Sequence, residues 1–245
     1  MPTPREQQDF VRAMFDRIAR RYDLLNSVIS FRLDSRWRKK AVRALGLGHE
    51  DRLVLDLGTG TGDLALQAAG QIEEKARIVG LDISLEMLRL AQAKKERRPY
   101  GGRTVCVLGS ALDPPLKGGI FDAIMTAFVL RNIPDLDLFF HNAYRLLRPG
   151  GRMVALDMYP PSGHPFSFFY ALYFYRLVPW IGAGLAHDRS AYQYLSDSVK
   201  TFKRPETVGE IMQKAGFEKV KIQRFLKGAV CLHMGEKSPP AAGRV

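Results

Sequence analysis

The chain has 245 residues, a formal net charge of +12 and 46% hydrophobic residues. This length allows one large α/β domain or two small ones, with a substantial core. The opening Met-Pro-Thr-Pro lacks a basic segment that leads into an apolar stretch, so we predict no secretory signal and expect a cytoplasmic protein. Cys106 and Cys231, the two cysteines, predict neither a disulfide framework nor a zinc site, and both are expected to be buried.

The first 45 residues supply half of the net charge, with 11 Lys or Arg against 5 Asp or Glu. A solvated basic surface would explain this excess. Attraction to nucleic acid or to an anionic membrane surface would explain it equally well. Charge alone leaves these interpretations open.

Two helical segments are predicted before the first strand. Apolar residues recur at helical spacing within residues 6–21, which predicts an amphipathic helix. Residues 22–47 should hold a short helix, a loop and a helix from Asp34 to Leu45, which Gly46 would end. We expect residues 1–48 to form an N-terminal helical cap.

A glycine-rich turn follows the first predicted strand. Leu53–Leu57 is an apolar run suited to a strand buried on both faces. Gly58, Gly60 and Gly62 come next, and glycine allows both positive φ and close approach of the backbone to a ligand. A helix is expected from Asp63, so its free N–H groups should point at whatever occupies the turn.

The spacing of acidic residues indicates which ligand this is. The dinucleotide fingerprint requires a glycine three residues after Gly60, but Asp63 stands there, so a pyrophosphate would meet a carboxylate. A carboxylate suits an ammonium group instead. A second buried strand ends at Asp82, which is placed to hydrogen-bond ribose hydroxyls. A ligand with both an adenosine and an ammonium group indicates S-adenosylmethionine. The alternative interpretation of this segment is an ordinary strand-to-helix turn that binds no ligand.

Strands and helices then alternate. Ser84 is predicted to cap a helix that reaches Arg98. Strands are predicted at 104–108, 121–127 and 152–157, with a helix at 136–147 and an RPGG turn before the last strand. This alternation favours a doubly wound parallel sheet.

Two pairs of residues follow strand ends. Ser110 and Ala111, after the third strand, would place backbone groups against an adenine ring. Arg131 and Asn132, after the fourth, stand where substrate and cofactor should meet. The alternative for the second pair is a loop anchor with its charge in solvent.

The segment 166–180 contains 8 of the 25 aromatic residues. Because Arg176 and Pro179 interrupt it, we predict a helix of a soluble protein rather than a membrane span. A core helix, the lining of an apolar cleft and contact with a bilayer remain open. Farther on, we predict helices at 189–202 and 206–214, a closing antiparallel strand pair at 217–226 and 228–237, and a disordered tail at 238–245.

Taken together, these segments resemble the C-methyltransferases of ubiquinone and menaquinone biosynthesis. The resemblance covers almost the whole chain and rests on YDLLNSVISFRLDSRW, GTGTGDLA, AFVLRN, LLRPGGRMVALD, DRSAYQYLSDSVKTF, AGFEKV and GAVCLH. It implies a class I S-adenosylmethionine-dependent methyltransferase fold over residues 49–237, α/β and Rossmann-like, with a mainly parallel, doubly wound sheet and a final antiparallel strand. A helical aromatic insertion at 158–204 and the N-terminal helices would cap the substrate.

The resemblance also implies the reaction. S-adenosylmethionine would methylate a ring carbon of a polyprenylated quinol, demethylmenaquinol to menaquinol first of all, and leave S-adenosylhomocysteine. The corresponding benzoquinol of the ubiquinone pathway is the alternative, and another small aromatic or a nucleic acid is a more distant one. A quinone- or lipid-binding protein on a degraded fold is a further rival, against which the intact glycine turn argues. We expect no nucleic-acid partner, transient contact with the inner membrane face, and leave a homodimer open.

Site residues follow by position from the resemblance. The residues expected to contact the cofactor are Tyr22, Asp56, Gly58, Gly60, Thr61, Asp63, Asp82, Ile83, Ser110, Ala111 and Ala127. Those expected to contact the substrate are Phe128, Phe169, Tyr173 and Tyr192. The chain departs from the family pattern at Leu25 and Asp34 (usually Met and His), Ser110 (Asn), Ala127 (Ser), Asp157 (Glu), Tyr159 (Ser) and His187 (Asn).

Methyl transfer from a sulfonium is a direct displacement, so the protein mainly aligns the reactants and excludes water, and no metal is expected. The ring carbon becomes nucleophilic when an adjacent hydroxyl loses its proton, so the substrate should be the reduced quinol. We expect Arg131 to stabilise the phenolate and Asn132 to orient a ring oxygen. His187 is the candidate base, although a lone histidine in a loop is more often polar surface.

Overall fold

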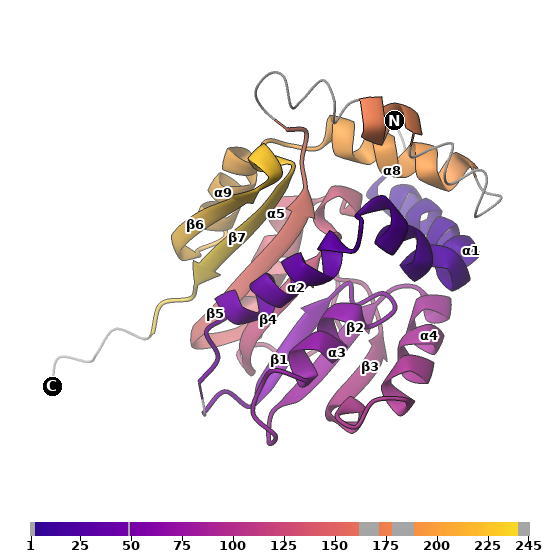
Figure 1. Ribbon diagram of the computed structural model, residues 1–245. Helices are drawn as coiled ribbons and strands as arrows, with labels where there is room; N and C mark the ends of the chain where they lie inside the picture. Colours follow the sequence, from indigo (N-terminus) through magenta and orange to yellow (C-terminus); the bar gives the residue numbers. More distant parts are fainter. Residues whose placement is uncertain (1–2, 49, 162–171, 178–188, 240–245) are drawn as a thin grey trace, which may run out of the picture.

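The computed structural model describes residues 3–48, 50–161, 172–177 and 189–239 (Figure 1). In the described chain, seven strands form one sheet in the order β3-β2-β1-β4-β5-β7-β6. Their bounds are β1 Leu53–Leu57, β2 Arg77–Asp82, β3 Thr104–Leu108, β4 Phe121–Ala127, β5 Leu147–Met158, β6 Glu218–Phe225 and β7 Val230–Glu236. The first five strands pair in parallel, whereas β7 runs antiparallel to β5 and β6. The predicted doubly wound, mainly parallel sheet with an antiparallel strand is confirmed.

Helices cover both faces of the sheet. The helices α2 (Leu33–Ala44) and α3 (Asp63–Ala69) share one apolar core with one face, and α5 (Leu136–Leu146) and α9 (Pro205–Lys214) share another with the opposite face. In β1, Val54 belongs to the first core and Leu55 and Leu57 to the second, because successive side chains point to opposite faces. Apolar residues on both sides explain why the strand reads as a continuous apolar run.

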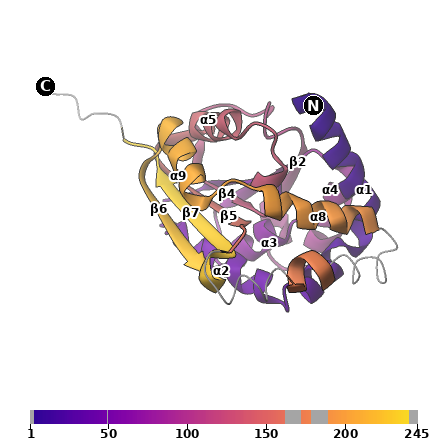
Figure 2. The same ribbon diagram turned by 90° about the horizontal axis from the view of Figure 1, so that it is seen from above.

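Two helices lie over the end of the sheet where the parallel strands finish. They are α1 (Pro4–Ile29) and α8 (Arg189–Thr201), and Figure 2 shows α8 crossing above the sheet with α1 along one side. Buried residues of both helices pack with Phe174 in a third apolar cluster, whose other members are Met14, Ile18, Leu25, Ile29, Ala191 and Val199. The carboxyl ends of the strands are therefore covered by the N-terminal helix and by a helix that follows β5 in the chain.

The prediction of a separate short helix after residue 21 is wrong. Helix α1 continues to Ile29, because Leu25 and Ile29 extend the buried stripe that includes Ile18 and pack into the third cluster. The turn to α2 is made by Phe31 and Arg32, both with positive φ. Helix α4 (Leu85–Glu96) begins as predicted, with the Ser84 hydroxyl accepting the N–H of Met87.

Other predictions are refined by the structure. The RPGG segment lies within β5 as an irregularity, since Phe121 pairs with Leu147 but Ala123 pairs with Arg152. Of the aromatic segment, Leu172–Leu177 forms a π-helix and the remaining residues lie outside the described chain. No helix within the described ranges has the length and apolar character needed to cross a bilayer. Cys231 is buried as predicted, whereas Cys106 is partly exposed.

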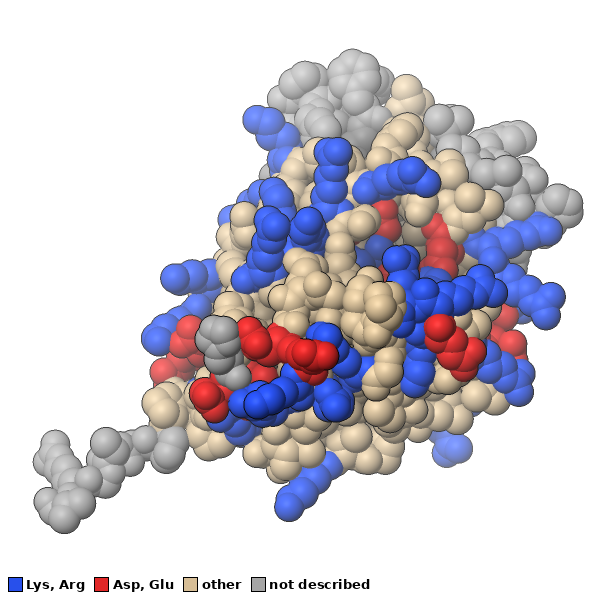
Figure 3. All heavy atoms as spheres, turned by 60° about the horizontal axis from the view of Figure 1, so that its bottom comes forward, with Lys and Arg blue, Asp and Glu red and all other residues tan. Residues whose placement is uncertain are grey.

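The positive charge lies at the surface. Figure 3 shows Lys and Arg side chains gathered over the upper left of the face in view, where few Asp or Glu side chains interrupt them. Acidic side chains collect lower on the same face and lie beside cations there. The excess charge therefore has an uneven distribution, which bears on what the protein contacts.

Candidate active site

The glycine turn joins β1 to α3 beneath α1. The N–H groups of Gly58 and Thr59 donate to the carbonyl oxygen of Leu81 at 2.8 and 3.0 Å, which fixes the turn on the neighbouring strand. Gly58 has φ 73°, and a Cβ there would stand 2.5 Å from Val129. Packing against Val129 therefore requires this glycine.

Gly60 differs, since its φ is +54° but a Cβ there would meet nothing within 4 Å. The absent side chain leaves open space in the turn. The Gly60 N–H donates to Asp82 Oδ2 at 2.7 Å, while Asp82 Oδ1 accepts the N–H of Ser84 at 2.9 Å. Burial raises the pKa of Asp82, although these backbone donors act in the opposite direction.

Asp56, at the end of β1, is a buried carboxyl with an oxygen to spare. Its Oδ2 accepts the hydroxyl of Thr59 at 2.8 Å, while Oδ1 has no hydrogen bond of normal geometry. Burial raises the pKa of Asp56 to about 7, an effect that the Thr59 hydrogen bond opposes and the charge of Asp82 reinforces. The group is poised to ionise when a cation comes near.

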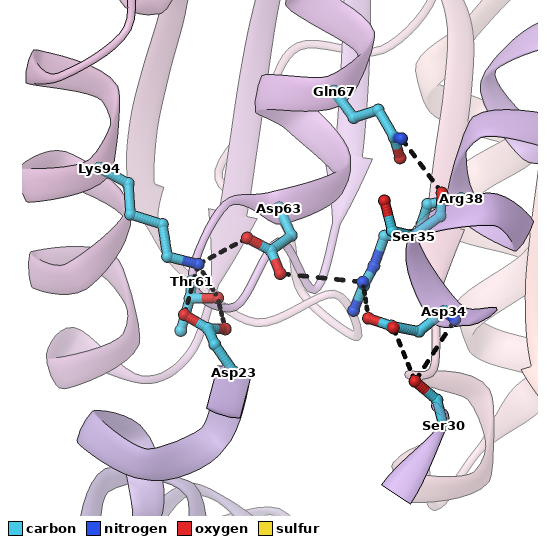
Figure 4. A network of polar contacts seen from close by, with 9 residues as sticks. All are labelled: Asp23, Ser30, Asp34, Ser35, Arg38, Thr61, Asp63, Gln67 and Lys94. Carbon is cyan, nitrogen blue, oxygen red and sulfur yellow. Dashed lines mark hydrogen bonds and ion pairs between the residues drawn. The ribbon is translucent and has the colours of Figure 1, made fainter. Parts of the chain in front are cut away.

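A polar network ties the glycine turn to α1 and α4 (Figure 4). Lys94 Nζ lies 2.6 Å from Asp63 Oδ1 and 2.5 Å from Asp23 Oδ2, and it donates to Thr61 Oγ1 at 2.8 Å. The Thr61 hydroxyl in turn donates to Asp23 Oδ1 at 2.6 Å. Asp63, predicted to bind an ammonium, thus already has a cationic partner.

The same network reaches α2 on the other side of Asp63. Arg38 Nη1 lies 3.8 Å from Asp63 Oδ2 and 2.5 Å from Asp34 Oδ2, and the Ser30 hydroxyl donates to Asp34 Oδ1 at 2.7 Å. Asp34 occupies a position where the family pattern given above usually has a His. Because the Asp34 and Arg38 side chains are both buried, the pair fixes α2 beside the turn and keeps a guanidinium at the site.

These residues line a first cavity, and its empty space of about 950 Å³ includes the solvent at its opening. Ten of the eleven residues predicted to contact the cofactor line it: Tyr22, Asp56, Gly58, Gly60, Thr61, Asp63, Asp82, Ile83, Ala111 and Ala127. Ser110 is the exception, since its hydroxyl accepts a hydrogen bond from Gln8 Nε2 of α1 at 2.6 Å beside the cavity. The structure thus brings together nearly all of one predicted set.

A second cavity, of about 1070 Å³ and mostly apolar, adjoins the first. Tyr22, Arg38 and Phe128 line both cavities. Phe128 has φ +64°, a strained backbone for a residue with a side chain, and its N–H donates to Leu156 O at 2.7 Å. The Arg38 and Arg131 guanidinium carbons lie 5.3 and 6.0 Å from the centre of its ring.

Arg131 and Asn132 stand at this junction. Arg131 Nη1 bonds Asp157 Oδ1 at 2.5 Å, and both side chains are buried. Burial alone would lower the pKa of Arg131, but Asp157 and Tyr22 outweigh it and raise the pKa. The buried Arg131 Nε has no hydrogen-bond partner, and Asn132 Nδ2 donates to Phe128 O at 3.4 Å. The alternative of an Arg131 charge in solvent is wrong.

The remaining predicted residues divide into two groups. Tyr173 lines the second cavity, and its hydroxyl donates to Ile29 O at 2.9 Å. Phe169, His187 and the side chain of Tyr192 lie outside the described residues. Within the described ranges, no group of three or more His, Cys, Asp or Glu side chains is placed to hold a metal ion.

Sequence reasoning missed Arg38 and Lys94. Arg38 belongs to the basic run RWRKK, in which nothing separates one cation from the next except its spacing of four residues from Asp34. Lys94 stands beside Lys95 and near Glu96 on α4, and its partners come from parts of the chain 31 and more residues away. Only the fold brings these charges to the turn.

The strand order, the glycine turn and the acid at the end of β2 define the class I S-adenosylmethionine-dependent methyltransferase fold, as predicted. A solved structure agrees: phosphoethanolamine N-methyltransferase 2 of Haemonchus contortus, in complex with S-adenosylhomocysteine, superposes with a TM-score of 0.66 at 17% identity. The match covers 97% of this chain and 61% of that one. At that identity the similarity shows the fold.

The family follows from the sequence itself. Residues 3–237 match the model of the ubiE/COQ5 methyltransferase family, and the chain belongs to that family. It is 40% identical to a demethylmenaquinone methyltransferase of Thermus thermophilus, over 91% of this chain and 100% of the relative. It is 37% identical to the ubiquinone/menaquinone biosynthesis C-methyltransferase of Geotalea daltonii, over 95% and 98%. The predicted family and class of enzyme are confirmed.

Proposed function

We propose that the protein transfers a methyl group from S-adenosylmethionine to a ring carbon of a polyprenylated quinol, with demethylmenaquinol as the favoured acceptor. The names of its relatives support the quinol, and one of them names demethylmenaquinone alone. The observation on which the proposal rests is the junction, at Phe128, of a cavity lined by three carboxyl groups and the glycine turn with a second, almost entirely apolar cavity. A cofactor with several charged groups and an acceptor with a long apolar tail need such a pair.

The first cavity fits the cofactor. The open space at Gly60 admits a ligand against the backbone, and the unsatisfied Oδ1 of Asp56 is a ready acceptor for an ammonium. Asp63 supplies a second carboxylate, and Lys94 offsets part of its charge. Asp82 would bind the ribose hydroxyls, and Ile83 and Ala111 would flank the adenine. When bound, S-adenosylmethionine supplies an electrophilic methyl group.

The acceptor ring would lie at the junction and its tail in the second cavity. Phe128 and Tyr22 offer ring faces there, and Arg38 and Arg131 offer charge. Apolar residues such as Trp37, Phe174 and Val230 line the rest. Burying tail surface stabilises the complex by about 25 cal/mol per Å², so the second cavity favours acceptors with a prenyl chain.

The buried charges would promote loss of the quinol proton. Arg131 has a free Nε–H, and a phenolate oxygen would accept from it in surroundings with little water. Asp157 offsets part of the Arg131 charge and Asp34 part of the Arg38 charge, so the two guanidinium groups would stabilise the phenolate together. Burial raises the pKa of Tyr22, so its phenol stays protonated and donates a hydrogen bond. We propose His187 as the base, and normal turnover of His187→Ala across pH would remove it from the mechanism.

The test is incubation with labelled S-adenosylmethionine and a panel of reduced naphthoquinols and benzoquinols, with mass spectrometry of the products. We expect label on a ring carbon, with the prenylated naphthoquinol turned over fastest. Faster turnover of the benzoquinols would move the favoured substrate to the ubiquinone pathway. Absence of transfer to every ring carbon would overturn the proposal.

A further inference from the structure

Two turns at the mouth of the second cavity share a strained backbone and the same residue order. Phe31 and Arg32, between α1 and α2, have φ of 51° and 61°, and Leu226 and Lys227, after β6, have φ of 46° and 55°. In both turns a large apolar residue precedes a cation. Left-handed backbone is unfavourable for residues other than glycine, so both turns hold their side chains in place at an energetic cost.

The apolar residues of the turns are exposed. Phe31 is 72% and Leu226 43% exposed, although both also line the second cavity. Leu24 and Val28, 61% and 39% exposed, lie one turn apart on α1, just before the turn that holds Phe31. Leu172, 56% exposed, adjoins Tyr173, whose ring stacks on Phe31 at 5.6 Å. We call these five residues the apolar rim.

Cations flank the apolar rim. Exposed side chains of this kind on the turns and along α2 are Arg32, Arg36, Lys39, Lys40, Arg43 and Lys227. Over the described chain, none of the six has an acidic partner within salt-bridge distance. Lys40 Nζ lies 4.7 Å from the centre of the Phe225 ring, which connects α2 to the second turn.

We propose that the apolar rim docks on an anionic phospholipid bilayer. Its large apolar side chains would enter the headgroup region, and the flanking cations would meet lipid phosphates. Each turn supplies one large apolar side chain and one cation. A bilayer with anionic headgroups and an apolar interior can bind both groups at once. The second cavity would then open toward the bilayer and receive the substrate's tail from it, a step that rests on the proposed function, whereas docking itself does not.

The test is flotation of the full-length protein with vesicles of phosphatidylglycerol and phosphatidylcholine, or of phosphatidylcholine alone. We expect binding to the anionic vesicles that weakens as salt is added. Two double variants, Phe31→Asn with Leu226→Asn and Arg32→Gln with Lys227→Gln, should each lower binding about tenfold or more, a loss equal to about 1.4 kcal/mol or more. Asparagine is chosen because it tolerates positive φ.

The matched control is Leu138→Asn with Lys75→Gln. Leu138 is 40% exposed on α5, which covers the face of the sheet opposite α2, and Lys75 is an exposed cation outside the rim. This control should float like the native chain. Equal binding of the native chain and both rim variants would overturn the proposal, as would equal binding to the two kinds of vesicle. A dimer in solution that the rim substitutions abolish would overturn it in favour of a second copy of the chain.

Turnover separates docking from function. Arg32→Gln with Lys227→Gln should methylate a tail-less quinol in solution at the native rate but lose turnover of a long-tailed quinol held in anionic vesicles. If the native chain methylates neither quinol and yet floats, the proposed function fails while docking stands. If the variant turns over the vesicle-held quinol at the native rate, docking plays no part in substrate entry.

Discussion

Asp56 and Asp63 are two carboxylates of one cavity in different surroundings. Asp63 is paired with Lys94, whereas Asp56 has an unsatisfied oxygen and a pKa raised to about 7, chiefly by burial. An ammonium bound beside Asp56 favours its ionised form, so binding below pH 7 must release a proton. The affinity for S-adenosylhomocysteine should therefore rise about twentyfold from pH 5.5 to 7.5, as titration calorimetry would measure.

Asp56→Asn should bind the ligand more weakly and lose this slope, whereas Asp63→Asn should keep it, because Asp56 remains. A slope that persists in Asp56→Asn would contradict the assignment. Stability provides a second readout. Since the folded pKa of Asp56 lies above its ordinary value of 3.8, its contribution to the free energy of unfolding is fully present below that pH and is lost as the pH rises through about 7. The free energy of unfolding of Asp56→Asn should therefore rise relative to that of the native chain over that range.

Gly58 and Gly60 are alike in the sequence but have different neighbours. Alanine at Gly58 would push its Cβ into Val129, whereas alanine at Gly60 would meet only open space. Both substitutions strain a positive φ by about 1 to 2 kcal/mol. Gly60→Ala should keep the fold with a lower melting temperature and raise the Kd for S-adenosylhomocysteine tenfold or more. Gly58→Ala should lose considerably more stability in thermal unfolding, and the reverse order would contradict the model of the turn.

At the scale of elements, α1 is attached to the loops after three successive strands. Asp23 bonds Thr61 after β1, Asp16 accepts from Ser84 after β2, and Gln8 donates to Ser110 after β3. Other residues of α1 line the first cavity, so we expect movement of this helix to assist cofactor exchange. Breaking one attachment should speed release of the cofactor product.

Asp23→Ala should raise the dissociation rate of S-adenosylhomocysteine about threefold to tenfold, while the free energy of unfolding changes by about 1 kcal/mol or less, as is usual for a partly exposed pair. Stopped-flow displacement would measure the rate. Asp9→Ala is the matched control, since Asp9 lies on the same helix and pairs with exposed Arg12. Equal effects of the two substitutions would mean that α1 is held by general packing instead.

Sequence patterns predict several elements of this fold but not all of them. The bounds of β1, β3 and β4 follow from short runs rich in apolar residues, and β1 and β4 are buried on both faces, where few polar residues are tolerated. The continuity of α1 could not be predicted, because Asn26 and Ser27 favour a loop locally, and only packing of Leu25 and Ile29 against residues from the far end of the chain overrides that preference.

For the site, position in the resemblance identified the lining of the first cavity, since most of these residues follow strand ends that a parallel sheet brings to one edge. It did not identify Arg38, and it predicted Arg131 without its partner Asp157, because these interactions join residues distant in sequence. Arg38 reaches Asp63 across 25 positions, and the Arg131–Asp157 pair joins the ends of β4 and β5. Such pairs form only when the strands and helices are in place.

At the scale of the whole molecule, the cofactor and the acceptor tail occupy different cavities that meet at Phe128. Substitutions in each cavity should therefore affect different kinetic parameters. Tyr173→Ala removes apolar surface from the second cavity and should raise KM for a long-tailed quinol about fivefold to tenfold, at about 25 cal/mol per Å². It should change KM for a tail-less quinol less than twofold.

Phe15→Ala is the matching substitution in the other cavity, because Phe15 lines the first cavity and not the second. It should raise KM for S-adenosylmethionine and leave the ratio of KM values for long-tailed and tail-less quinols unchanged. Steady-state kinetics with both acceptors at fixed, saturating second substrate would measure each parameter separately. If Tyr173→Ala raised both quinol KM values equally, the tail would lie elsewhere, and the apolar cavity would then serve the ring alone.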